Sequence, residues 1–402
     1  MKKSIVILAA SLLCLPAFAQ ENQKDEGYKF TISKQLPVTS IKNQNKSGTC
    51  WDYAGTAFLE AELLRMGKGE YDLSEMFTAC YDYQDRAMAS IRKHGDLGFS
   101  QGGCFGDILH CMERYGLVPE EQMPAGVMHR DSLAVFNEMN QMVGPLVKAA
   151  CGNGSLQSDA NNELLSMKAI RSVLQVYLGV PPEKFTYKGK EYTPKSFYES
   201  TGLNADDYIQ VTAFNHAPLY GTFAPESPDN WRNDPAYNVT LDELLAIADY
   251  AIDHGYPVGW DSDVSEQGWR LGIKKGFVVL PATETAANTQ GSDMERWAGK
   301  SAKEIQDEAA DHPTPQRWVT PEERQLAWDN HETNDDHLML IYGTATDQMG
   351  NEYYLVKNSW GDYGTYHGMF FCSKAYFRYK TITILIHKDA LSKEMKKKLG
   401  IR

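Results

Sequence analysis

Cys50 is the residue of this chain whose surroundings best suit a nucleophile. It lies in the stretch Gln44–Trp51 (QNKSGTCW), just before an apolar segment that predicts a helix over 55–66, closed by Gly67. A cysteine at the start of a helix lies at the positive end of the helix dipole, which favours the thiolate over the thiol. Gln44 can donate from its side-chain amide and Cys50 from its backbone N–H. This spacing predicts a thiolate nucleophile beside an oxyanion hole.

A base for this nucleophile is predicted near the C-terminal end of the sequence. His337 follows two aspartates and precedes an apolar run over 338–342, which predicts a strand that begins at the imidazole. Asn358 comes twenty-one residues later in the stretch KNSWG, at the end of a second predicted strand. Its side chain can accept a hydrogen bond from the imidazole, and Trp360 can shield that bond from water. Alone, each residue has an ordinary structural explanation, but together they favour Cys-His-Asn nucleophilic catalysis.

The order Gln-x5-Cys-Trp, Asp-His, Asn-Ser-Trp-Gly resembles the papain-like cysteine peptidases. The resemblance implies peptide hydrolysis through an acyl-enzyme, with catalytic roles for Gln44, Cys50, His337 and Asn358. The stretch SQGG at 100–103 is similar to the Cys-Asn-Gly-Gly stretch of that family, whose glycines give the substrate backbone room to approach. The candidate substrate-binding residues are accordingly Gly102, Gly103, Asp336 and Trp360.

One branch of that family resembles the chain more closely. Ser47 and Ser100 stand where secreted members usually carry a disulfide, and both cysteines are also absent in the bleomycin hydrolase and aminopeptidase C branch. The same branch is similar at YGLVP (115–119), TPKSFY (193–198), PVGWDSDV (257–264) and HLM (337–339), so the similarity spans about residues 36–390. It implies an aminopeptidase that acts on peptides, carries a large helical insertion and assembles as a homo-hexamer.

The expected fold is α+β, because predicted helices come first and predicted strands come late. The resemblance makes it a papain-like two-lobed fold, with a helical lobe, an antiparallel β-barrel-like lobe and a large helical insertion. Besides 55–66, the predicted helices are 73–92, 104–115, 131–149, 158–177, 240–254 and 320–329, and the predicted strands are 338–342, 352–357, 368–371 and 382–386. The expected divisions are a signal peptide at 1–19, a loosely held N-terminal arm at 20–35, the helical lobe with Cys50 at 36–124, the insertion and start of the β lobe at 125–330, and the β lobe with a short C-terminal tail at 331–402.

Charge and the N-terminal segment bound the function further. The net charge of −13 argues against a surface that wraps nucleic acid, because phosphate neutralisation requires clustered Lys and Arg. Residues 1–19 carry Lys2 and Lys3, an apolar run and a small-x-small end at Ala17–Ala19, which predicts export to the periplasm or outside the cell. The apolar run is too short to span a membrane, so no membrane anchor is expected.

Cysteine and histidine spacing excludes two other designs. Besides Cys14 and Cys50 the chain has five cysteines, and Cys104 and Cys111 lie too far apart on one predicted helix to bridge, so a dense disulfide framework is not expected. No pair of His or Cys residues shows metal-ligand spacing, so we expect no metal or other cofactor.

Two functional alternatives stay open. In the resembling branch a C-terminal arm lies in the cleft and binds the substrate amino terminus, whereas here only residues 388–402 follow the last predicted strand. A shortened arm favours an endopeptidase of the same family. The alternative of another class is an inactive relative that serves as a binding or scaffold protein.

Overall fold

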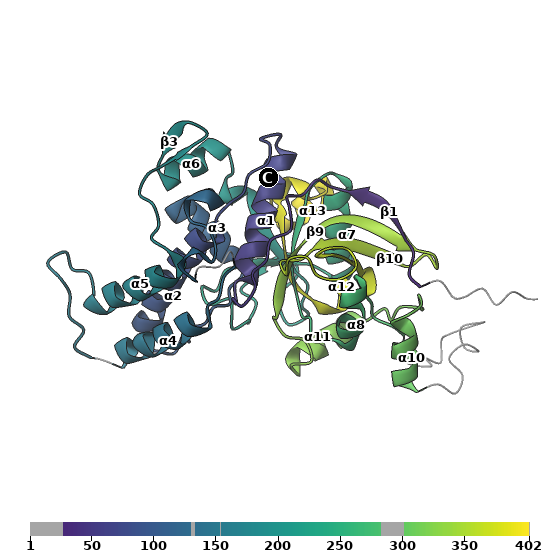
Figure 1. Ribbon diagram of the computed structural model, residues 1–402. Helices are drawn as coiled ribbons and strands as arrows, with labels where there is room; N and C mark the ends of the chain where they lie inside the picture. Colours follow the sequence, from purple (N-terminus) through teal and green to yellow (C-terminus); the bar gives the residue numbers. More distant parts are fainter. Residues whose placement is uncertain (1–26, 130–132, 153, 283–300, 402) are drawn as a thin grey trace, which may run out of the picture.

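The computed structural model describes residues 27–129, 133–152, 154–282 and 301–401, so the predicted signal peptide lies outside the described residues. Helices gather on one side of the molecule and a large sheet on the other (Figure 1). The helical lobe contains α1 (Cys50–Arg65), α2 (Glu75–Arg92), α3 (Phe105–Tyr115), α4 (Asn137–Cys151), α5 (Leu165–Leu178), α6 (Pro194–Thr201) and the hairpin β2 (Phe185–Tyr187) and β3 (Lys190–Tyr192).

The β lobe is built on one ten-stranded sheet in the order β5-β6-β4-β12-β7-β9-β10-β11-β8, with β1 also paired to β9. Its strands are β1 (Phe30–Gln35), β4 (Tyr208–Thr212), β5 (Thr222–Phe223), β6 (Ala236–Asn238), β7 (Val258–Ser262), β8 (Phe277–Val278), β9 (His337–Asp347), β10 (Glu352–Lys357), β11 (Met369–Ser373) and β12 (Thr381–His387). The helices of this lobe are α7 (Leu241–Asp253), α8 (Gln267–Gly272), α10 (Ala302–Ala309), α11 (Pro321–Asp329), α12 (Lys374–Lys380) and α13 (Lys393–Leu399). The pairings are antiparallel except β4 with β6 and β8 with β11, so the sheet is more mixed than predicted.

Strand β9 joins the two lobes through its alternating side chains. Leu338 and Leu340 belong to the core of the helical lobe, whereas Met339 and Ile341 belong to the core of the β lobe. Because successive side chains of a strand point to opposite faces, one continuous apolar run supplies both cores. The start of β9 is thereby fixed between the lobes.

Helix α1 is buried along nearly its whole length, from Trp51 to Leu63. It packs against β9 and β7 on one side and against α3 on the other (Figure 1). A Cβ on Gly55 would lie 2.7 Å from Ile108, so glycine allows α1 and α3 to approach closely. Most of its buried side chains are apolar, but the acidic side chains of Asp52, Glu60 and Glu62 are buried with them.

The α+β class is confirmed, and most predicted elements appear within a few residues of their predicted ends. The strands between 208 and 262 were not predicted, because they are short. In β7, Gly259 and Asp261 also interrupt the hydrophobic pattern of the strand. The expectation of a loosely held arm at 20–35 is wrong for its last six residues. These form β1, which pairs with β9 from Phe30 opposite Asp347 to Gln35 opposite Gly343.

The stretches at 115–119 and 193–198 contact each other in the fold. Gly116 has φ of 92°, and a Cβ there would collide with the backbone of Pro194. Leu117 donates its N–H to the Pro194 carbonyl at 3.2 Å. Gly116 thus permits a turn and a backbone contact that a larger residue would disrupt.

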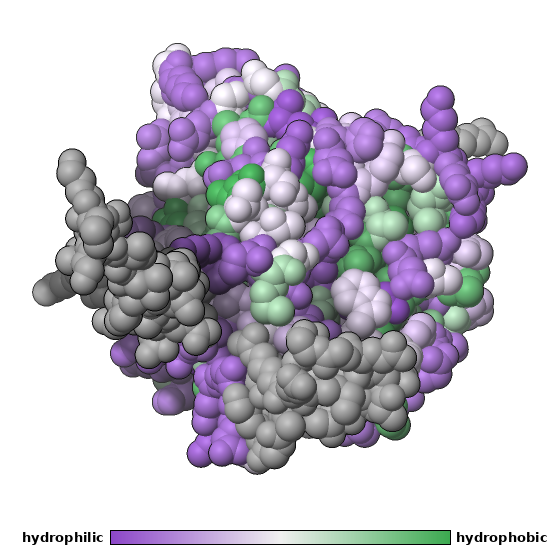
Figure 2. Space-filling view, turned by 90° about the vertical axis from the view of Figure 1, so that its right-hand side faces the viewer, coloured by the Kyte–Doolittle hydropathy of each residue, from purple (hydrophilic) through white to green (hydrophobic). Residues whose placement is uncertain are grey.

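The surface of the β lobe is mainly hydrophilic where Figure 2 shows it, with apolar areas separated by polar side chains. No described helix is both long and apolar enough to span a bilayer.

Candidate active site

Cys50 is the first residue of α1 and is half-buried as a residue. Hydrogen bonds to a neighbouring loop hold the turn that precedes it. Gln101 accepts from the Gly48 N–H through its side chain at 2.9 Å, and from the Trp51 indole N–H through its carbonyl at 2.9 Å. These bonds tie the start of α1 to the loop at 100–103 without a disulfide.

Ser47 and Ser100, the positions of the absent disulfide, have separate partners. The Ser47 hydroxyl donates to the Gln44 carbonyl at 2.6 Å, and the Ser100 hydroxyl donates to Asp229 at 3.3 Å. All six described cysteines are free.

His337 begins β9 and contacts both residues predicted to accompany it. Its Nε2 lies 2.8 Å from Oδ1 of Asn358, and Trp360 stacks on its ring with centroids 4.9 Å apart. Because Oδ1 is an acceptor, Nε2 carries the proton and Nδ1 has a free lone pair. The imidazole is only 3% exposed, so its hydrogen bond to Asn358 is shielded from water.

The Cys50 thiol lies beside the same strand end, because it makes a hydrogen bond to the backbone of Leu338. The structure therefore brings Cys50, His337 and Asn358 together at the junction of α1, β9 and the loop after β10.

Gln44 has its side-chain amide held at both ends. Its Oε1 accepts from the Ser359 hydroxyl at 2.6 Å, and its Nε2 donates to the Ser47 carbonyl at 3.0 Å. In the described part of the chain the second N–H on Nε2 makes no other hydrogen bond. The backbone N–H of Cys50, in the first turn of α1, also lacks an intrahelical acceptor. These two N–H groups can stabilise a negative oxygen.

The pKa shifts of Cys50 and His337 do not favour the thiolate that the helix start predicts. Burial raises the pKa of Cys50 to about 12, the Leu338 backbone opposes that rise, and the carboxylates of Asp335, Asp229 and Asp261 add to it. Burial also lowers the pKa of His337 to about 4. A helix dipole contributes only about 0.3–1 kcal/mol, so it does not outweigh these effects. Both shifts favour the neutral thiol and the neutral imidazole over the ion pair.

The predicted substrate-binding residues have different positions. Gly102 is half-buried, whereas Gly103 is buried and a Cβ there would lie 3.0 Å from the Trp51 ring. Asp336 is exposed and accepts from the Val264 N–H at 3.2 Å. Gly102 is therefore the glycine that a substrate backbone can reach.

Two residues of this site, Ser359 and Gln101, were not predicted from the sequence to have a role. Ser359 orients the Gln44 amide, and Gln101 ties the start of α1 to its neighbouring loop. Each is adjacent to a predicted site residue, and that adjacency was the available signal.

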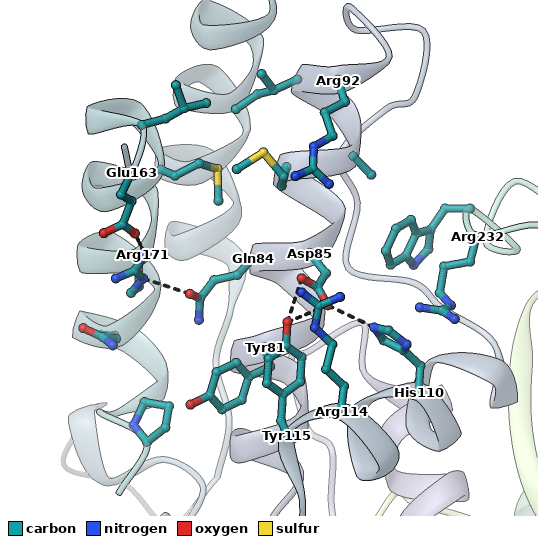
Figure 3. Close-up of a pocket in the computed structure, with 18 of the residues that line it drawn as sticks. Tyr81, Gln84, Asp85, Arg92, His110, Arg114, Tyr115, Glu163, Arg171 and Arg232 are labelled. Carbon is teal, nitrogen blue, oxygen red and sulfur yellow. Dashed lines mark hydrogen bonds and ion pairs between the residues drawn. The ribbon is translucent and has the colours of Figure 1, made fainter. Parts of the chain in front are cut away.

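A hollow also lies in the helical lobe (Figure 3), and Cys50 is not among the residues that line it. Its volume is about 900 Å³, and its walls come mainly from α2, α3 and α5. Charged side chains in it pair with one another: Asp85 lies 3.1 Å from Nε2 of His110 and accepts from Tyr115 at 2.8 Å. It holds no arrangement of nucleophile and base. Among the described residues, no group of His, Cys, Asp and Glu is placed to hold a metal.

Comparison with known proteins identifies the family and the fold. The family model described as "Peptidase C1-like family" matches residues 2–278 and 322–401. Aminopeptidase C of Streptococcus thermophilus is 24% identical over 416 residues, covering 93% of this chain and 86% of that protein. "Cysteine proteinase 1, mitochondrial" of Saccharomyces cerevisiae is 22% identical, covering 94% and 80%. The crystal structure of PepW from a Lactobacillus superimposes with a TM-score of 0.67 at 20% identity, covering 92% of this chain and 84% of that one. The predicted fold is confirmed.

Proposed function

The chain belongs to the Peptidase C1-like family of cysteine peptidases, and on that premise we propose that it is an aminopeptidase whose nucleophile is Cys50. The observation that carries the catalytic assignment is the 2.8 Å contact between His337 and Asn358, at the strand end that also contacts the Cys50 thiol. The relatives named aminopeptidase C support the direction of cleavage.

The proposed reaction begins with proton transfer from the Cys50 thiol to Nδ1 of His337, while the sulfur attacks the peptide carbonyl. The amide N–H of Gln44 and the backbone N–H of Cys50 stabilise the developing oxyanion. His337 then donates its proton to the leaving amine, and the bond between carbon and nitrogen breaks. Water, deprotonated by His337, hydrolyses the thioester and restores the thiol. Asn358 holds the imidazole throughout, with Nδ1 directed to the reacting atoms.

A neutral resting pair suits this sequence of steps. Burial disfavours both the thiolate and the imidazolium, so the ion pair forms when a substrate carbonyl and the oxyanion donors are in place. The enzyme then does not hold a reactive thiolate in the absence of peptide.

The nucleophile is tested by Cys50→Ala, with Cys151→Ala as the matched control, because Cys151 is the other partly exposed free thiol of the described chain. Cys50→Ala should abolish peptide hydrolysis and labelling by an epoxide thiol inhibitor, and Cys151→Ala should retain both. Labelling of wild type at Cys50 also excludes the inactive scaffold alternative. Full hydrolysis by Cys50→Ala would refute the mechanism.

The two accompanying residues should give graded losses. His337→Ala removes the group that moves the proton and should cost about 10²–10⁴-fold in kcat. Asn358→Ala removes only the group that orients it and should be slower than wild type yet measurable. Equal activity of His337→Ala and wild type would remove His337 from the mechanism.

The endopeptidase alternative is supported by the position of the C-terminal tail. Helix α13 packs on the β lobe, where Lys398 pairs with Glu243 at 2.9 Å. The Arg65 guanidinium, at the C-terminal end of α1, lies over the Tyr256 ring, which in turn contacts His387 just before the tail. Cys50 lies at the opposite end of α1 from Arg65, and a helix of sixteen residues is about 24 Å long. One peptide assayed with a free and with an acetylated amino terminus distinguishes the two activities.

Export and assembly complete the proposal. The pattern of residues 1–19 supports a signal peptide, so the N-terminal sequence of the protein recovered outside the cytoplasm should begin near Gln20. The family resemblance supports a homo-hexamer, which the mass of the purified protein in solution tests directly. An uncleaved N-terminus would contradict the first expectation, and a monomer the second.

A further inference from the structure

A short segment bridges the two lobes next to the thiol. We call residues 225–230 the bridging segment. Its Ser227 hydroxyl donates to the carboxylate of Asp335 in the β lobe, and its Asp229 accepts from the Ser100 hydroxyl of the helical lobe at 3.3 Å. The Asp229 N–H donates to the same Ser227 hydroxyl at 3.2 Å. Ser227 therefore links the Asp335 carboxylate to the backbone of Asp229, whose own carboxylate contacts the helical lobe.

The bridging segment is held in place by its own hydrogen bonds. The buried Asn230 amide donates to the Pro225 carbonyl at 3.1 Å and to the Asp234 carbonyl at 3.0 Å. Its Oδ1 accepts from the Asp234 N–H at 2.8 Å. A side chain that satisfies three backbone groups fixes the local turn, so the two ends of the bridge have defined positions.

Asp229 occupies the space beside the glycine that a substrate backbone can reach. A Cβ on Gly102 would collide with the Asp229 carboxylate. The Gly102 carbonyl is itself held by Arg86, which is buried. An extended peptide running along Gly102 therefore meets a carboxylate, and its chain cannot continue through that point.

The wall that the bridging segment forms is acidic. Asp229 is 31% exposed and Asp335 is partly exposed. Their charges act at Cys50, because both add to the rise of its thiol pKa after burial. The one cation close to Asp229 is Arg86 at 3.7 Å among the described ion pairs, and its guanidinium already donates to the Gly98 and Gly102 carbonyls.

A buried carboxyl, that of Asp261, supports Asp335 from inside the protein. Asp261 is 1% exposed and its Oδ1 accepts no hydrogen bond within the described chain, while its Oδ2 accepts from Thr383 at 3.2 Å. Asp261 and Ser227 both line a cavity of about 10 Å³, which is room for about one small polar group. Burial and the neighbouring Asp335 raise the pKa of Asp261 well above its usual range, so this carboxyl carries a proton and shares a side-chain hydrogen bond with Asp335.

We propose that Asp229, supported by Asp335 across Ser227, binds the α-ammonium group of peptide substrates, and that the bridging segment ends the cleft there. This inference rests on the proposed aminopeptidase function and names the group that sets its direction. An acidic wall attracts an ammonium and repels a carboxylate, so of the two exopeptidase directions only the amino-terminal one fits. The anchor then comes from within the chain, and the C-terminal tail is not required.

Two other acidic residues near the site are poorer anchors. Asp263 is fully buried and pairs with Lys380 at 3.1 Å, so its charge is already compensated. Asp336 already accepts a hydrogen bond from Val264.

The test compares Asp229→Asn with Glu226→Gln, a matched control that removes one charge from an exposed side chain of the same segment. Each protein is assayed on one peptide arylamide with a free amino terminus and on its N-acetylated form. Wild type and Glu226→Gln should cleave the free form much faster than the acetylated one. Asp229→Asn should lose about 10- to 100-fold in kcat/KM on the free form, mostly through KM, with no loss on the acetylated form. The midpoint of thermal unfolding reports whether the variant is folded.

The outcomes separate this inference from the function on which it rests. If wild type cleaves both forms equally, the aminopeptidase proposal fails whatever the variants do. If wild type requires the free amine and Asp229→Asn keeps the wild-type preference, the anchor is overturned and the aminopeptidase stands. If Asp229→Asn does not fold, Asp335→Asn removes the second carboxylate without touching the Gly102 loop and should weaken the same preference. An unchanged preference in a folded Asp335→Asn then overturns the inference.

Discussion

The Ser359 hydroxyl donates to Oε1 of Gln44 at 2.6 Å, across 315 residues of sequence. The backbones of the same two residues are also joined, because the Gln44 N–H donates to the Ser359 carbonyl at 2.8 Å. Asn358, the preceding residue, holds the His337 imidazole. Two consecutive residues thus position both the base and the side-chain donor of the oxyanion hole.

This arrangement predicts that Ser359→Ala lowers kcat about 10-fold with little change in KM, because the Gln44 amide loses the donor that fixes its orientation. Gln44→Ala, which removes the oxyanion donor itself, should cost about 10²–10³-fold. The losses should not add in the double variant, since both act through one amide. Ser172→Ala, at an exposed helical serine, is the control and should match wild type. Additive losses would show that Ser359 acts elsewhere.

The candidate catalytic residues Cys50, His337 and Asn358 were predicted from residue spacing and family resemblance. The structure shows why such a prediction is possible. Cys50 starts a helix and His337 starts a strand, so hydrophobic patterns fixed where each side chain would lie. The bridging segment could not be predicted in this way. Asp229 and Asp335 are 106 residues apart in the sequence. They are linked through Ser227, in a turn that has no periodic hydrophobic pattern and that contacts both lobes.

The direction of the Cys50 pKa shift could not be predicted from the sequence either. The helix start was visible, but burial and the surrounding carboxylates depend on tertiary packing, and they reverse the expected sign of the shift. The N-terminal strand β1 was missed for a similar reason. Its polar sequence has little strand pattern, and pairing with β9 decides its structure.

Asp335 should control the pH dependence of thiol reactivity. Burial raises its pKa to about 6, so above that pH the group is charged and adds to the rise in the Cys50 pKa. Asp335→Asn removes this charge, which should lower the thiol pKa and speed alkylation above about pH 6. Below that pH the wild-type carboxyl is protonated and neutral, so the two rates should converge. Iodoacetamide labelling across about pH 5–9, corrected with Cys50→Ala, measures this effect. A faster wild type above pH 6 would contradict the sign.

Reducing agent should not lower the thermal stability of the protein. All six described cysteines are free, and hydrogen bonds through Gln101 tie the start of α1 where a disulfide is absent. The midpoint of thermal unfolding should therefore be the same with and without dithiothreitol, whereas activity should rise after air exposure as Cys50 is restored from reversible oxidation. Gln101→Ala should lower the unfolding midpoint in both conditions. A marked loss of stability under reductant alone would reveal a disulfide.

The C-terminal tail should contribute to stability and not to substrate selection. Leu399 is 6% exposed and packs in the β-lobe core, and Lys398 pairs with Glu243 at the start of α7. Deleting residues 399–402 should cost about 2 kcal/mol in the free energy of unfolding, through loss of the buried leucine. Leu399→Ala is the matched control, because it loses similar burial without shortening the chain. Urea unfolding measures the stability of both variants.

In the same two variants, the ratio of kcat/KM on free and N-acetylated peptide should equal that of wild type. The tail lies beside the far end of α1 from Cys50, and the ammonium anchor that we assign is Asp229. If the truncated enzyme gains activity on acetylated peptide while Leu399→Ala does not, the chain terminus itself must reach the cleft. That result would restore the tail as the amine anchor and leave Asp229 as a structural partner of Arg86 and Ser100.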